Sequence, residues 1–180
     1  MMSSMRSYFV LALQLIGTFT ILFLVQDTAL QTVLFLTLWA VTFYPLTKAE
    51  LILFTLACVV YTIADLVVIQ YGVFHFTHSD IGLLPYYEPF MWGFYFLHAK
   101  RLLGNASIVW YVGYLTVLGI AIEFTGTTLA LWSYDIPYYV AWWIGSWAAS
   151  GAILATICIP LSDWVARKTS ARPALTAVGS

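Results

Sequence analysis

The sequence predicts an all-α, polytopic membrane protein whose six transmembrane helices are arranged as helical hairpins. Three observations predict this fold class: the 180 residues are 62% hydrophobic, only 8% are charged, and the mean hydropathy is +0.91. A soluble domain usually carries about 25% charged residues, so water would not solvate this chain's surface. The 7 basic residues, balanced by 8 acidic ones, also argue against a nucleic-acid-binding protein, which needs a basic patch.

Six apolar runs account for most of the chain. A helix that crosses a bilayer needs about 20 apolar residues, with a range of roughly 17–25. The runs comprise residues 8–25, 29–46, 51–74, 83–97, 108–132 and 137–165. The fourth run is short, and we expect Pro85 to open its helix, a position that proline favours. We therefore expect one transmembrane domain over residues 1–168 and a flexible cytoplasmic tail over 169–180.

The charged residues fix an orientation for this six-span arrangement. All basic residues fall on one side of the predicted membrane, namely Arg6, Lys48, Lys100, Arg101, Arg167, Lys168 and Arg172. The opposite connectors contain Asp27, Asp80 and Asp135 and no basic residue. Because cytoplasmic loops carry the excess of Lys and Arg, both termini are expected to be cytoplasmic. We expect a multi-pass protein of the plasma membrane.

A short motif recurs before the fourth and sixth runs. Pro85-Tyr86-Tyr87 is repeated as Pro137-Tyr138-Tyr139, each time after a loop that contains an aspartate. The repeat indicates two parallel hairpins, formed by runs three and four and by runs five and six. The first hairpin would be a degenerate third copy, and coincidence remains the alternative.

Three acidic residues lie inside the predicted spans: Asp65, Glu88 and Glu123. A charge at the bilayer centre costs at least about 2.5–3.5 kcal/mol, which makes such residues candidates for function. At a helical rise of about 1.5 Å per residue, all three lie roughly 8–9 Å below the outer face. One layer predicts one pocket, in which desolvation and mutual repulsion would keep at least one carboxyl group protonated near neutral pH.

Glu88 is the expected general acid, with Glu123 and Asp65 setting its protonation or acting as base. Aromatic residues near the acids predict a wall that can stabilise a carbocation by cation–π attraction or hold a polyene by shape. The predicted substrate-binding residues are Tyr61, Phe74, His75, Trp92, Tyr95, Trp132 and Tyr134. We expect no metal site and no cofactor, because His75, His78 and Glu88 lack a recognised metal-ligand spacing.

Each candidate also has a structural interpretation. Asp65 could hydrogen-bond a serine or threonine of another helix, and Glu88 could be a first-turn acid that the helix dipole favours. His75 and His78 lie near the outer headgroups, where polar interfacial residues are common. Glu123 has no such explanation in the sequence.

The third and fourth runs resemble the membrane-type lycopene cyclase domain. That family carries an Asp in one helix, a Gly-aromatic turn, and a Pro-x-Glu-Glu motif that opens the next helix. The matching residues are Asp65, the segment 72–76 (GVFHF) and the segment 82–90 (GLLPYYEPF), in which Tyr87-Glu88 stands where the family has paired acids. The fifth and sixth runs are similar to the membrane carotenoid hydratases, through Glu123, Gly126, the turn 132–134, Pro137 and Ala141-Trp142.

Both resemblances imply that a carboxylic acid protonates a terminal isoprene double bond and forms a tertiary cation. Proton loss after ring closure would make a cofactor-independent cyclase, an isomerase or lyase of carotenoid biosynthesis, whereas capture by water would make a hydratase. The expected partners are an isoprenoid substrate taken from the bilayer and membrane lipids, with a homo-oligomer left open. The alternatives are a small proton- or cation-coupled transporter, a lipid-binding membrane protein, or a structural assembly subunit.

Overall fold

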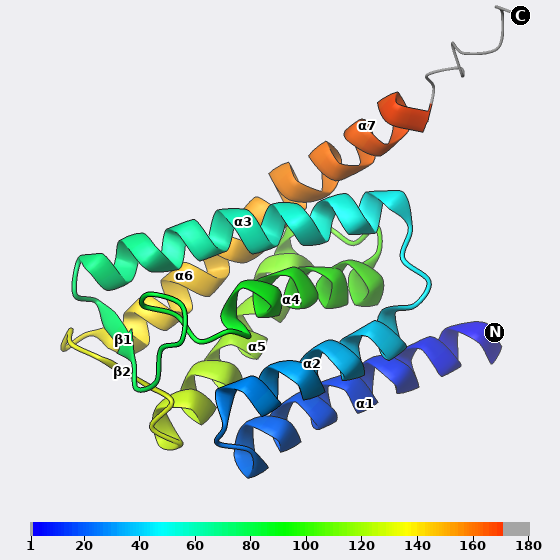
Figure 1. The fold of residues 1–180 in the computed structure, drawn as a ribbon. Helices are drawn as coiled ribbons and strands as arrows, with labels where there is room; N and C mark the ends of the chain where they lie inside the picture. Colours follow the sequence, from blue (N-terminus) through cyan, green and yellow to red (C-terminus); the bar gives the residue numbers. More distant parts are fainter. Residues whose placement is uncertain (1, 171–180) are drawn as a thin grey trace, which may run out of the picture.

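The computed structural model describes the backbone of residues 2–170 and the side chains of residues 8–169. The chain is helical in every predicted run (Figure 1). The helices are α1 (Met2–Leu24), α2 (Thr28–Phe43), α3 (Lys48–Gln70), α4 (Glu88–Leu103), α5 (Ile108–Thr128), α6 (Tyr139–Ile153), the π-helix η1 (Leu154–Cys158) and α7 (Ile159–Ser170). The predicted tail begins inside α7, and its residues 171–180 lie outside the described residues.

Three helices are long and apolar enough to cross a membrane. They are α3, α5 and the continuous helix Tyr139–Thr169, which combines α6, η1 and most of α7. Two further apolar helical segments, Tyr8–Leu24 and Thr28–Phe43, are shorter. The chain is therefore an all-helical protein with the character of a membrane protein.

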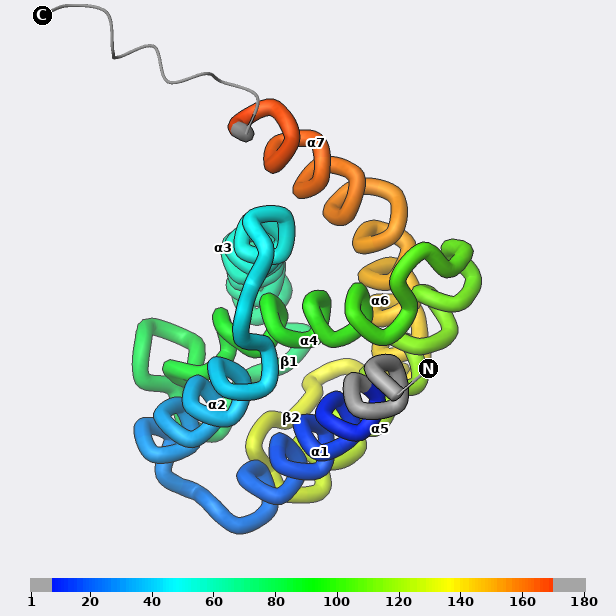
Figure 2. The backbone as a smooth tube through the Cα atoms, turned by 90° about the vertical axis from the view of Figure 1, so that its right-hand side faces the viewer, coloured from blue at the N-terminus to red at the C-terminus, as the bar shows by residue number. Residues whose placement is uncertain are grey.

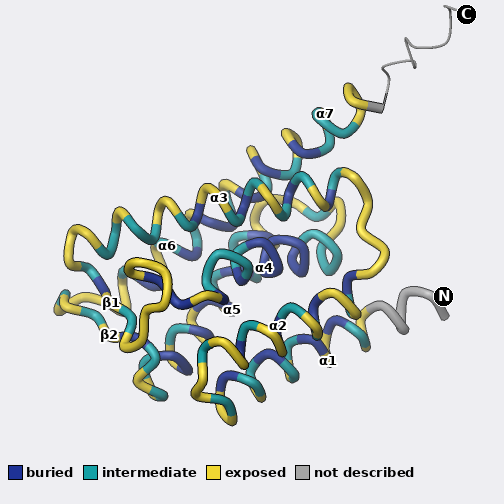
Figure 3. Tube along the Cα trace, in the orientation of Figure 1, coloured by how far each residue is buried: buried dark blue, intermediate teal, exposed yellow. Residues whose placement is uncertain are grey.

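Helix α4 lies at the centre of the molecule, between the α1/α2 pair on one side and α3 on the other (Figures 1 and 2). Figure 3 shows a long buried stretch along α4 in dark blue. Half of the 16 residues of this helix are buried, namely Met91, Gly93, Phe94, Tyr95, Phe96, Leu97, His98 and Ala99. Side chains from α2 and α3 pack on it, and Phe94 contacts the rings of Trp39 and Phe54 at centroid distances of 4.1 and 4.8 Å.

The start of α4 differs from the prediction. The helix begins at Glu88, with Pro89 in its first turn, and Pro85 lies in the preceding turn. A bridge between Ile81 and Leu84 closes the turn before Pro85, so Leu83 and Leu84 at the start of the apolar run belong to a loop. Proline has no backbone N–H, which is tolerated in the first turn of a helix because the N–H groups there have no partner within the helix. Pro89 occupies this position in the structure, as Pro85 was expected to do.

Two short strands were not predicted. β1 (Phe74–Phe76) and β2 (Trp132–Tyr134) pair antiparallel, with Phe74 opposite Tyr134 and Phe76 opposite Trp132. Only Phe74 and Trp132 were assigned to the ends of the third and fifth runs, and the other strand residues were assigned to the segments that follow those runs. The helices end earlier because Gly72 and Ala130 adopt left-handed backbone conformations, with φ of 68° and 53°.

The segments α3–β1 and α5–β2 are two copies of one unit, 58 residues apart. Gly72 corresponds to Ala130, and equivalent backbone bonds close both helices, from Val73 N to Val68 O (3.2 Å) and from Leu131 N to Gly126 O (2.8 Å). The strand contacts are reciprocal as well, since Thr77 N donates to Leu131 O and Asp135 N to Val73 O. α3 packs chiefly on α4, and α5 on α6, as the repeat predicts. Asp65 and Glu123 occupy equivalent positions in the two units.

Ion pairs close the end of the bundle opposite the strands. Arg101 Nε lies 2.7 Å from Glu50 Oε1, and Lys100 Nζ lies 3.0 Å from Asp163 Oδ1. Glu50 also completes a capping box with Thr47 at the start of α3. These contacts tie the C-terminal end of α4 to α3 and α7.

Candidate functional site

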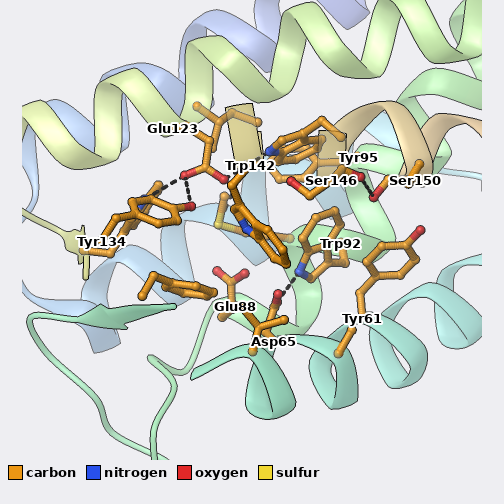
Figure 4. Close-up of a pocket in the computed structure, with 18 of the residues that line it drawn as sticks. Tyr61, Asp65, Glu88, Trp92, Tyr95, Glu123, Tyr134, Trp142, Ser146 and Ser150 are labelled. Atoms are coloured by element: carbon orange, nitrogen blue, oxygen red, sulfur yellow. Dashed lines mark hydrogen bonds between the residues drawn. The ribbon is translucent and has the colours of Figure 1, made fainter. Parts of the chain in front are cut away.

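A cavity of about 230 Å³ lies between α3, α4, α5 and α6, next to the two strands. Aromatic residues are the largest group in its lining, which also contains three carboxyl groups, from Asp65, Glu88 and Glu123 (Figure 4). The acids come from three different helices and two copies of the repeat. The sequence predicted that Asp65, Glu88 and Glu123 share one pocket, and in the structure all three line the same cavity.

Asp65 and Glu88 form one side of the site. The Asp65 carboxylate accepts a hydrogen bond of 2.6 Å from Trp92 Nε1, and Glu88 lies within hydrogen-bonding reach of Asp65. The Trp92 ring is stacked between the rings of Tyr61 and Trp147, at centroid distances of 4.5 and 4.9 Å. This stacking fixes the indole that orients Asp65.

Glu123 forms the other side of the site. Its Oε2 accepts hydrogen bonds from Trp132 Nε1 (2.9 Å) and Tyr134 Oη (2.8 Å), and its Oε1 accepts one from Trp147 Nε1 (3.1 Å). Two of these donors belong to β2, which follows α5 after a three-residue turn, and the third belongs to α6. Three donors directed at one carboxyl group match the anionic form, which is an acceptor only.

Close helix packing brings these donors to Glu123. A Cβ atom at Gly119 would lie 2.0 Å from the Trp147 ring, and one at Gly126 would lie 2.0 Å from the Trp132 ring. Each indole thus occupies space that only a glycine leaves free. The two glycines of α5 that flank Glu123 therefore position two of its three hydrogen-bond donors.

Nine of the ten predicted site residues line the cavity. Besides the three acids they are Tyr61, Phe74, Trp92, Tyr95, Trp132 and Tyr134. His75 is not among the described residues that line it. Its Nδ1 lies 3.0 Å from Asp135 Oδ2 and its Nε2 lies 2.9 Å from Ser133 Oγ, on the exposed face of the sheet. Successive side chains of a strand point to opposite faces, so Phe74 and Phe76 face the cavity while His75 faces outward.

The prediction missed the contribution of α6 to the lining. This helix provides Trp142, Ser146, Trp147, Ala149, Ser150 and Ile153. Their spacing of three or four residues is that of one helix face and was the available signal. Phe76 and Met91 were also missed.

The structure agrees with the structural role considered for Glu88 but not with the one considered for Asp65. Asp65 is held by an indole N–H rather than by a serine or threonine hydroxyl. Glu88 lies in the first turn of α4, as a helix-dipole role requires, and it lines the cavity as well. Within the described residues, no group of three His, Cys, Asp or Glu side chains is arranged to hold a metal ion.

Comparison of the chain with protein-family models, curated proteins and solved structures gives no match. Chemically, the site offers two neighbouring carboxyl groups, a third carboxyl group that accepts three hydrogen bonds, and aromatic faces around a space of about 230 Å³.

Proposed function

We propose that the protein is an integral membrane enzyme that protonates an isoprenoid double bond with a buried carboxylic acid. The observation that carries this proposal is the convergence of three carboxyl groups on one aromatic-walled cavity. An apolar substrate would enter such a cavity readily, and a positive charge formed there would find both aromatic faces and an anion. The resemblance to membrane-type lycopene cyclases and carotenoid hydratases favours the same chemistry.

The proposed topology has six membrane-spanning helices with both termini in the cytoplasm of a plasma-membrane protein. The basic residues support this orientation: Lys48, Lys100, Arg101, Arg167 and Lys168 lie at or beyond the helix ends opposite the strands. Asp80 and Asp135 lie beside the strands at the other end. The acid layer would then be in the outer half of the membrane.

Glu88 is the proposed proton donor, and Asp65 is its proposed partner. Two carboxyl groups in contact carry one shared proton at lower cost than two charges. In the proposed step, the Glu88 O–H bond breaks, the π electrons of the terminal double bond form the new C–H bond, and a tertiary cation remains beside the Glu88 carboxylate. Trp92 would keep Asp65 oriented toward Glu88 throughout.

Glu123 is the proposed counterion of the cation. Its three donors fix the position of the negative charge before the reaction, which is the arrangement that stabilises charge without reorganisation. Attack of a second double bond would close a ring, and loss of a proton to the Glu88 carboxylate would restore the acid. Substrate and product would then be isomers, and no cofactor would be consumed; capture by water would instead give an alcohol.

A transporter would need a water-accessible path from the acids to both sides of the membrane. Between the cavity and the ion pairs at the far end of the bundle, the core consists of fully buried apolar side chains: Leu53, Ala57, Phe96, Leu97 and Leu115. The buried polar pair at this level, His98 and Gln14 (2.8 Å), is absent from the described lining of the cavity. This apolar layer favours the enzyme over the transporter.

The proposal can be tested in a bacterial host that accumulates lycopene. Expression of the protein should yield a new cyclic or hydroxylated carotenoid, and Glu88→Gln should abolish it. Asp135→Asn is the matched control, because Asp135 is an acid on the exposed face of the sheet. Unchanged lycopene despite membrane expression would contradict lycopene as the substrate, and equal loss in Asp135→Asn would contradict the assignment to the cavity.

A further inference from the structure

The long C-terminal helix, Tyr139–Thr169, packs against α3 mainly in its C-terminal half. α7 and η1 pack against α3, whereas α6 packs chiefly on α5. The change occurs at the π-helix Leu154–Cys158, which ends two residues before Pro160. Proline has no N–H to donate and disturbs the preceding turn, which accounts for the π-helical turn at this place. As a result, α3 and α6 are separated at the level of the cavity.

The cavity has exposed lining residues along this separation. Ala64 of α3 and Ala149 and Ile153 of α6 line the cavity and are also exposed on the outer surface. The exposed neighbours on the two helices are apolar, including Ile63 and Ile144. A mouth with small apolar side chains on an apolar surface opens toward lipid rather than toward water.

The cavity is small compared with the molecules that the proposed chemistry would use. A protein cavity of about 150 Å³ holds one benzene molecule. By that measure, 230 Å³ holds about ten carbon atoms, or roughly two isoprene units. A long isoprenoid can therefore place only one end among the three acids, and the rest of the chain must lie outside the cavity.

We propose that the opening between α3 and α6 is the lipid-side entrance for one end of a long linear isoprenoid hydrocarbon. The remainder of the chain stays in the bilayer, so the site recognises the terminal isoprene units rather than the full length. This inference rests on the proposed function for the class of ligand. It adds specificity-determining residues, since the small side chains of Ala64 and Ala149 set the width of the mouth.

Thiol protection tests the entrance without relying on catalysis. Ala149→Cys and, as a matched control on the same helix, Ala141→Cys would be reconstituted in lipid nanodiscs; Ala141 is exposed and absent from the described lining. Alkylation by a lipid-soluble maleimide would be followed by peptide mass spectrometry, which separates the new thiol from Cys58 and Cys158. The probe is lycopene, with squalene as a second long isoprenoid.

Lycopene should slow alkylation at position 149 by about tenfold when its concentration is about ten times its Kd, and should leave position 141 unchanged. Ala64→Cys on the facing helix α3 should show the same protection. This variant replaces Ala149→Cys in the test if Ala149→Cys does not insert into the membrane. Equal rates with and without both probes at positions 149 and 64, or equal slowing at position 141, would overturn the entrance.

The same experiment separates the entrance from the proposed reaction. Adding Glu88→Gln should preserve protection, because binding of the chain end does not require proton transfer. Protection without any product would overturn the acid chemistry and leave the entrance standing. Product formation without protection at either position would overturn the entrance and leave the acid chemistry standing.

Discussion

Asp65 and Glu123 hold the same place in the two copies of the α–β unit, yet their surroundings differ. Among the described residues, the side-chain N–H that reaches Asp65 is that of Trp92, and the remaining neighbour is a second acid, Glu88. Glu123 instead accepts hydrogen bonds from three side chains, those of Trp132, Tyr134 and Trp147. Two units with the same backbone fold thus carry different acid sites. Asp65 and Glu88 form a pair suited to share a proton, whereas Glu123 is a single carboxylate suited to hold a negative charge.

The difference arises in the helices that follow the two units. Counted from Pro85 and Pro137, Glu88 corresponds to Val140, so the second hairpin lacks the extra acid. Tyr95 corresponds in the same way to Trp147, which supplies the third donor to Glu123. The two similar units thus place one acid each in one cavity, and the different residues of α4 and α6 give these acids different roles in our proposal.

The largest effect is expected for the acid pair. Glu88→Gln keeps the shape of the side chain but removes the proton that it would donate, so product formation should fall by about 10²–10⁴-fold. The unfolding temperature in detergent should change little, because the amide can still hydrogen-bond Asp65. A variant that retains more than half of the wild-type rate would exclude Glu88 as the acid.

Glu123→Gln should reduce both activity and stability. The amide removes the anion that would face the cation, which predicts a loss of about 10²–10³-fold in rate. Its NH₂ group must also meet at least one of the three donors, and a buried donor left without an acceptor costs about 1–3 kcal/mol. Thermal unfolding of both Gln variants checks the comparison, and equal stability of the two would contradict the different surroundings described for the two acids.

A smaller effect is expected from the glycine that accommodates Trp147. Where the first unit has Tyr61, the second has Gly119, and a methyl group there would lie 2.0 Å from the indole. Gly119→Ala should therefore displace Trp147 from Glu123 and destabilise the fold by about 1–3 kcal/mol. Gly113→Ala in the same helix is the control, because nothing lies within 4 Å of the added carbon. Replacing glycine within a helix should there stabilise by about 0.5–1 kcal/mol.

The sequence was sufficient to predict a helix in each apolar run, because the length of an apolar run can be counted from the residues alone. It could not predict the rotation of the helices, on which the convergence of Asp65, Glu88 and Glu123 depends. The strands were missed because the alternation of aromatic and polar residues in Phe74–Phe76 and Trp132–Tyr134 covers only three residues, whereas a strand is normally recognised from four or more. The contribution of α6 to the cavity lining was missed because the pattern of Trp142 and Trp147 is equally typical of a helix face that packs against another helix.

His75 offers the mildest test of the comparison, and it checks the strand register directly. Its pair with Asp135 is about half exposed on both sides, at 55% and 52%, and such surface pairs contribute about 0–1 kcal/mol. His75→Ala should thus leave product formation unchanged and shift stability by no more than about 0.5 kcal/mol. Phe74→Ala, one residue earlier, should cost about 3–5 kcal/mol and impair activity, because Phe74 packs against Tyr134 inside the cavity. If His75→Ala impaired activity as strongly as Phe74→Ala does, the alternation of the strand would be wrong, and the donors that β2 provides to Glu123 would need a different register.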